Sequence, residues 1–311
     1  METADGKGVP IRRPADAPRI YDHQHRQGPK PDRKKVATLG SVYTVDRYVR
    51  TPEEVVEALF RQPDEEHSEP DRPRPCHKHT YARLFCQTDE GEIVDGQAAV
   101  FSWMTHEVGS RDPGGTKEKV CIMDGQPSLW DIKDLVQDGV ETTDILDLLH
   151  VTPRLWRATH VFYAQGSPAA EKFVHQQVLR VLQGKTCSVI RGLRRLATIR
   201  KVSKTKRQQI ERICRYFENN KERMRYDKYL RNGYPIASGV IEGACRHVVK
   251  DRLERAGMNW TVPGAQAMLQ LRCLYINGQW EQFIKYRINR ETARLYPHRS
   301  LVEETHWALA T

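Results

Sequence analysis

The spacing of apolar residues changes along the chain from strand-like to helix-like. Over residues 36–50, apolar and polar residues alternate, which predicts one or two strands. The segment 51–54 (TPEE) has the cap, early proline and acids of a helix start. A group of apolar residues between Gly96 and Val108 predicts a further helix.

The centre of the chain has the pattern of an α/β unit. An apolar run at 119–125 ends in Asp124-Gly125, residues 129–139 have helical spacing, and residues 142–150 (TTDILDLLH) are predicted as a second buried strand. Such an order predicts a crossover between parallel strands, and ligand sites lie beyond the carboxyl ends of such strands. Asp124 and Asp147 are expected there, although an Asp-Gly pair after a strand is also an ordinary turn.

Helical spacing alone continues from Thr152 to about Arg225. Within this part, the stretch from Lys172 to Ile210 holds eleven Lys or Arg residues and no Asp or Glu. A solvated basic face and a surface that contacts phosphates both explain such a run. Two more amphipathic helices are predicted between Thr261 and Tyr296, with Trp280 and Phe283 in the core.

The segment from Tyr234 to Trp260 places one acid, Glu242, at the start of a basic helix. The helix is predicted to begin near residue 239 and to end near Gly257. Steps of three and four residues put Glu242, Arg246, Lys250 and Leu253 on one side. Glu242 either compensates the helix dipole or takes part in a site with acids from elsewhere in the chain.

Composition favours a polyanionic partner. The net charge is +10 and the isoelectric point is about 9.3, which points to nucleic acid before membrane. A mean hydropathy of −0.68 with no long apolar run predicts no membrane span, and no signal peptide is recognised. Seven scattered cysteines suit reduced thiols, so we expect a cytoplasmic protein. A zinc module is a minor alternative, built on Cys76, His77, His79 and Cys86.

Four segments together resemble the DDE transposases of bacterial insertion sequences, specifically the ISKra group. METADGKGVPIR resembles the first-aspartate motif, a strand ending in Asp-Gly, and VCIMDGQPSLW resembles the second, with its downstream Trp. ILDLLH resembles the Asp-x-x-His element that often follows. YPIASGVIEGACRHVVKDRLERAGMNW resembles the third motif and is the longest match.

The resemblance implies an α/β fold of the RNase H-like type, a mixed five-stranded sheet flanked by helices with an all-helical insertion before the last catalytic residue. Residues 1–150 would form the first part of this core, with irregular segments at 13–35 and 62–75. Residues 151–233 would be the basic helical insertion. Residues 234–311 would complete the core and add C-terminal helices.

The implied activity is metal-dependent DNA cleavage and strand transfer during transposition. Asp5, Asp124 and Glu242 would be catalytic and would hold Mg²⁺ or Mn²⁺, because hard ions take carboxylate oxygens. Asp147 and His150 would have supporting positions, and for His150 a purely structural role is as plausible. The expected DNA contacts are Arg246, Lys250, Arg194, Arg195, Arg200 and Lys201.

The partners implied are element-end and target DNA, on which the chain would act as a homo-oligomer associated with the bacterial nucleoid. Only four residues precede Asp5. We therefore expect a catalytic portion that lacks the family's N-terminal end-recognition region. The alternative is an inactive, truncated remnant that only binds DNA.

Overall fold

The computed structural model describes residues 1–12, 34–61, 72–87 and 93–297. Most residues of the two segments expected to be irregular, 13–35 and 62–75, lie outside these ranges. Lys34 and Lys35 already belong to a strand, and residues 72–75 have no regular structure.

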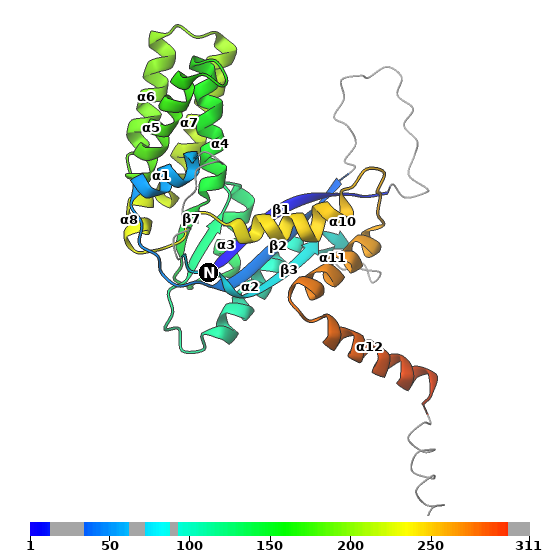
Figure 1. Cartoon of the computed structure of the whole chain (residues 1–311). Helices are drawn as coiled ribbons and strands as arrows, with labels where there is room; N and C mark the ends of the chain where they lie inside the picture. The colour runs from blue at the N-terminus through cyan, green and yellow to red at the C-terminus, as the bar shows by residue number, and fades with distance from the viewer. Residues whose placement is uncertain (13–33, 62–71, 88–92, 298–311) are drawn as a thin grey trace, which may run out of the picture.

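A five-stranded mixed sheet forms the centre of the molecule (Figure 1). Its order is β3-β2-β1-β6-β7, and the strands are β1 (Glu2–Pro10), β2 (Lys34–Thr44), β3 (Cys76–Leu84), β6 (Val120–Met123) and β7 (Thr143–Leu146). β2 pairs antiparallel with β1 and β3, whereas β1, β6 and β7 run parallel. The short strands β4 (Cys86–Gln87) and β5 (Ile93–Val94) form a separate pair. The expectation of an α/β fold with a mixed five-stranded sheet is confirmed.

The first strand is longer than its sequence suggests. It was expected to end at Asp5-Gly6, yet β1 continues to Pro10. Its residues have low strand propensity, but the whole of β1 is paired with β2. Pairing with a long apolar neighbour therefore overrides local preference.

Helices cover both faces of the sheet. Helix α2 (Gly96–Arg111) and the crossover helix α3 (Pro127–Val136) pack on the side of Ala4, Val42 and Met123. The opposite face, with Val9, Leu39 and Leu84, is covered by the C-terminal helices. Helix α1 (Pro52–Phe60) begins at Thr51 with the capping box that the sequence predicts.

The strand expected at 142–150 is less than half that length, which corrects the prediction. β7 ends at Leu146, and Leu148 begins helix α4 (Leu148–Phe162). The side chain of Asp147 accepts a hydrogen bond from the backbone N of Leu149 and so caps α4. His150 consequently lies in the first turn of a helix rather than at a strand end.

The long helical part forms a group of packed helices beside the sheet, drawn in green to yellow in Figure 1, and shares its core with β6 and β7. After α4 come α5 (Pro168–Leu182), α6 (Thr186–Ile199), α7 (Lys204–Asn220), the 3₁₀ turn η1 (Lys221–Arg223) and α8 (Tyr226–Arg231). The predicted apolar stripes are buried between these helices, with Phe217 and Tyr226 fully enclosed. No strand lies in this described stretch, as the helical spacing predicted.

The helix that carries Glu242 is interrupted by a π-helical turn. It comprises α9 (Gly239–Ala244), the π-helix η2 (Cys245–Lys250) and α10 (Asp251–Leu253), and so ends before Gly257. The wider π turn shifts the phase of the helical residues after it. Leu253 is therefore completely buried, while Arg246 and Lys250 are exposed, which corrects the predicted shared face.

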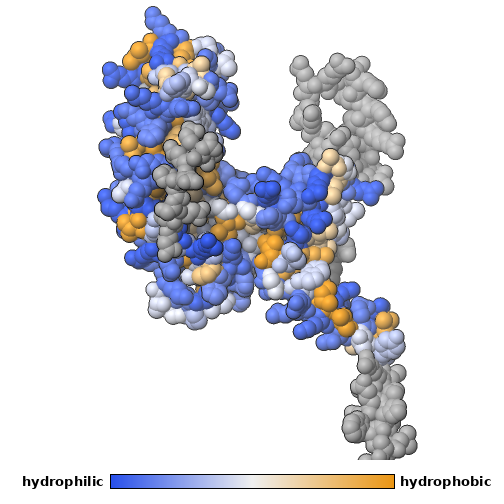
Figure 2. Space-filling model, viewed as in Figure 1, coloured by the Kyte–Doolittle hydropathy of each residue, from blue (hydrophilic) through white to orange (hydrophobic). Residues whose placement is uncertain are grey.

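The two expected C-terminal helices are α11 (Val262–Ile276) and α12 (Trp280–Leu295). The prediction that Trp280 and Phe283 belong to the core is wrong. α12 has no buried residue, and Trp280 is 40% exposed. The helix extends away from the sheet, and apolar side chains remain visible along it (Figures 1 and 2).

Candidate active site

Two aspartates lie next to each other where the central parallel strands separate. The β1–β6 pairing runs from Glu2 opposite Cys121 to Ala4 opposite Met123. The next residues in register are Asp5 and Asp124. Neighbouring strands are about 4.8 Å apart, so this register places both acids at the carboxyl end of β6. Sites in sheets of this kind lie at such ends.

Asp5 is buried and its carboxylate is already bound on three sides. One oxygen, Oδ2, lies 2.7 Å from Lys7 Nζ and accepts from Cys245 Sγ at 3.4 Å. The other, Oδ1, accepts from the backbone N of Gly6 at 2.7 Å. Asp5 and Lys7 share a face because side chains alternate along a strand, and η2 brings Cys245 onto that same face.

These contacts perturb the groups around Asp5. Burial, and next the negative charge of Asp5, raise the pKa of the Cys245 thiol far above its ordinary value. Burial alone would lower the pKa of Lys7, but the hydrogen bond from its ammonium to Asp5 and the charge of that acid outweigh it, so its pKa is raised. Lys7 therefore carries a firmly held positive charge beside Asp5.

Asp124 stands in a tight turn that is fixed from two sides. Its Oδ1 accepts from the backbone N of Gln126 at 2.9 Å, and its carbonyl oxygen accepts from Trp130 Nε1 at 2.7 Å. Tyr216 of α7 reaches the same turn, where its hydroxyl accepts from the backbone N of Gly125 at 3.1 Å. A β-carbon at Gly125 would collide with the end of the Tyr216 ring, so a larger residue there would require Tyr216 to move.

Glu242 lies on α9, over the face of the sheet that carries Asp5. Its side chain is 38% exposed, and its Oε1 is 3.8 Å from Nε2 of His150. That separation is too long for a hydrogen bond but close enough for attraction when the imidazole is protonated. Helix α4 thus contributes His150 to this region, and helix α7 contributes Tyr216.

Asp147 connects the end of β7 to the turn that precedes Glu242. It is almost fully buried and accepts from Ser238 Oγ at 2.5 Å and from the backbone N of Ser238 at 3.3 Å. Burial raises the pKa of this carboxyl, although all of its hydrogen bonds favour the charged form. The bonds fix Ser238, and Ser238 is the residue from which α9 begins.

The donor chemistry suits a hard divalent cation, because Asp5, Asp124 and Glu242 offer only carboxylate oxygens. A positive charge, the ammonium of Lys7, already lies against Asp5. In the part of the chain that the structure describes, however, no three His, Cys, Asp or Glu side chains converge into a metal cluster. Asp5 and Asp124 are at neighbouring positions of β1 and β6, but with Glu242 they do not form a closed ligand set.

The predicted DNA-contacting cations differ in how accessible they are. Arg194 is paired within the protein, because its guanidinium donates hydrogen bonds to the carboxylates of both Glu211 and Glu218 on α7. Arg200 donates to the carbonyl oxygen of Phe162 and lies over Tyr163. Arg200 is nevertheless exposed, as are the remaining predicted contacts Arg195, Lys201, Arg246 and Lys250.

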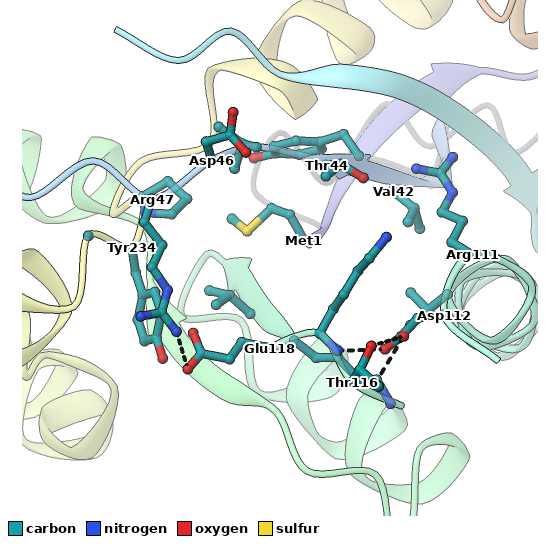
Figure 3. Close-up of a pocket in the computed structure, with 18 residues that line it drawn as sticks. Met1, Val42, Thr44, Asp46, Arg47, Arg111, Asp112, Thr116, Glu118 and Tyr234 are labelled. Carbon is teal, nitrogen blue, oxygen red and sulfur yellow. Dashed lines mark hydrogen bonds and ion pairs between the residues drawn. The ribbon is translucent and has the colours of Figure 1, made fainter. Parts of the chain in front are cut away.

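A separate pocket of about 380 Å³ lies away from the acids, at the amino ends of β1 and β6 (Figure 3). Met1 and Val42 line it, and the ion pair between Arg47 and Glu118, 2.5 Å long, closes one side. Because β1 and β6 run parallel, this end of the sheet is opposite the end that carries Asp124.

Sequence reasoning did not find Lys7, Cys245 or Tyr216. Lys7 had a usable signal, because it lies two residues from Asp5 on one strand and must share its face. Cys245 and Tyr216 gave none, since their approach depends on a π turn and on packing of the helical insertion.

The residues of the zinc alternative do not assemble a metal cluster among the described residues. Cys76 is exposed at the start of β3, and His79 pairs with Glu107 of α2. Within the described ranges, no helix combines the length and apolar character that crossing a membrane requires. No protein family, curated protein or solved structure matches the chain.

Proposed function

We propose that this chain is a DDE transposase of the RNase H-like type, which cleaves DNA strands and transfers them to new positions. The observation that carries the proposal is the register of β1 and β6, which brings Asp5 and Asp124 to neighbouring positions, while the helix of Glu242 packs over β1 and β2. A mixed sheet with a helical segment inserted before Glu242 agrees with the fold that the sequence resemblance implies.

Asp5, Asp124 and Glu242 would hold Mg²⁺ or Mn²⁺. When bound, such ions activate water or a 3′-hydroxyl and stabilise the leaving oxygen of the phosphodiester. Asp147 would position Glu242 through Ser238, and His150 would orient the Glu242 carboxylate. Tyr216 would hold the Asp124 turn in place.

DNA would approach along the exposed cations. Arg246 and Lys250 follow Glu242 on the same helical segment and are exposed, so they are placed to contact phosphates beside the acids. Arg195 and Lys201 would extend this contact over the helical insertion. Arg194 is better assigned to joining α6 and α7, because its charge is matched by Glu211 and Glu218.

A DNA-binding protein without catalysis is the second candidate. Two observations favour it: Asp5 is bound to Lys7 and Cys245, and no three ligands converge in the described residues. In that case the basic surface would bind DNA while the acids remain an inert part of the fold.

Nicking of supercoiled DNA separates the two candidates. The purified chain is incubated with plasmid that carries the element's ends, with Mn²⁺ or Mg²⁺, and nicked product is measured on gels. We expect nicking by the unmodified chain, and its loss in Asp124→Ala and Glu242→Gln. Asp131→Ala is the matched control, because Asp131 is an exposed acid on neighbouring α3. Binding without nicking in every variant would support the second candidate.

A further inference from the structure

Lys7 holds a position that nothing in the proposed chemistry explains. Its ammonium lies 2.7 Å from Asp5 Oδ2, and its side chain is only 22% exposed. Asp5 itself is buried within the central strand of the sheet. A buried carboxylate needs a compensating charge, and Lys7 supplies it.

The same ammonium occupies space that a metal ion at Asp5 would need. Oδ1 of Asp5 accepts from the Gly6 backbone, so Oδ2 is the oxygen that faces Lys7 and Cys245. A divalent ion and an ammonium at one oxygen repel each other strongly in a partly buried site. We therefore expect a metal ion at Oδ2 to displace the ammonium of Lys7.

We infer that Lys7 is an internal counter-cation, which neutralises Asp5 while the site holds no metal and is displaced toward solvent when a divalent cation binds. The inference rests on the proposed metal site. Lysine suits the role, since its long flexible stem lets the charge move outward while the strand stays in place.

The first test measures Mn²⁺ affinity by titration calorimetry on the full chain without DNA. Lys7→Met removes the competing charge but keeps the length of the side chain, so we expect Mn²⁺ to bind about tenfold more tightly or better. Lys7→Arg keeps a positive charge that can form two hydrogen bonds with a carboxylate. The Mn²⁺ affinity of this variant should therefore equal or fall below that of the unmodified chain. Lys35→Met on β2 is the control and should change nothing.

A second measurement needs no variant and therefore does not depend on whether Lys7→Met folds. Lysines are labelled with an amine-reactive reagent, with and without Mn²⁺, and the sites are quantified by mass spectrometry. We expect Mn²⁺ to accelerate labelling of Lys7 several-fold, because its amine leaves Asp5, while labelling of Lys35 stays constant.

The outcomes separate this inference from the proposed function. Mn²⁺ binding that disappears in Asp124→Ala but is unchanged in Lys7→Met, with no change in Lys7 labelling, would overturn the role of Lys7 alone. Weaker Mn²⁺ binding in Lys7→Met would also overturn it, since Lys7 would then support the site. If the unmodified chain and Lys7→Met both bind no Mn²⁺, the metal site and the inference fall together.

Discussion

The hydrogen bonds between Asp147 and Ser238 offer a quantitative test of how the site is held together. Asp147 is almost fully buried and accepts three bonds, one from Leu149 and two from Ser238. Asp147→Ala removes a helix cap, worth about 1 kcal/mol. It also removes two bonds to a charged acceptor, worth about 1.5–3 kcal/mol each, and leaves the Ser238 donors buried.

These contributions cannot simply be added, because burial of the carboxylate opposes them. Burial raises the pKa of Asp147, so part of the bonding energy offsets desolvation. We therefore expect Asp147→Ala to lower the free energy of unfolding by about 3–4 kcal/mol. Ser238→Ala keeps the cap and one backbone bond, so it should cost about 1–2 kcal/mol.

Urea-induced unfolding followed by circular dichroism measures these losses, and the double variant completes a mutant cycle. We expect the double variant to lose less than the sum of the two single losses, because both remove the same bond. A loss below about 1 kcal/mol for Asp147→Ala, or strict additivity, would refute the argument. If the turn positions Glu242, nicking by Ser238→Ala should fall by about 10–100-fold, as for other supporting residues.

Three further expectations concern contacts away from that turn. Gly125→Ala should lower the free energy of unfolding in urea by about 1–3 kcal/mol, because its β-carbon would collide with the Tyr216 ring. Adding Tyr216→Ala to the same chain should restore part of that loss. If the double variant recovers nothing, the collision is not the cause. Burial pushes the pKa of Glu107 upward, but hydrogen bonds from Arg111 and His79 lower it below its usual 4.5. The stabilising effect of ionised Glu107 should therefore be fully present above pH 4.5 and vanish as the pH falls through its folded-state pKa. The difference in free energy of unfolding between the unmodified chain and Glu107→Gln should then disappear in acid. A difference that stays constant with pH would contradict this role of Glu107. Arg195→Met should weaken DNA binding and reduce its salt dependence, whereas Arg194→Met should mainly loosen the packing of α6 on α7; equal binding losses in filter assays would overturn the distinction.

Several parts of the fold can be predicted directly from sequence patterns. The crossover from β6 through α3 to β7 was predictable because short apolar runs flank a segment with helical spacing. The helices from α4 to α8 were predictable for the same reason, and so was the capped start of α1. In each case the sequence pattern is local, because it depends only on residues of the same helix or strand or of its immediate neighbour in the chain.

The incorrect predictions arose where distant contacts decide the structure. β1 has few strand-forming residues and exists because β2 and β6 flank it. The side of the helix on which Leu253 lies depends on the π turn at η2, which α-helical spacing does not predict. Trp280 has the spacing of a core residue, but α12 lies against too little of the described protein to bury it.

The candidate site was predicted in part. The three acids came from motif resemblance, and the register of β1 and β6 explains why two of them can meet. The partners that hold these acids could not be predicted, because hydrogen bonds from Cys245 to Asp5 and from Gly125 to Tyr216 join segments far apart in the sequence.

The contact between Asp5 and Cys245 spans 240 residues, and this separation has a consequence for synthesis of the protein. β1 is synthesised before α9 and η2, which follow the other strands of the sheet and the helical insertion in the chain. Pairings so distant in sequence form late and slowly, because a long loop must close before they are stabilised. A nascent chain therefore cannot close the contact between Asp5 and Cys245 until the 240 residues that separate them in sequence have been synthesised.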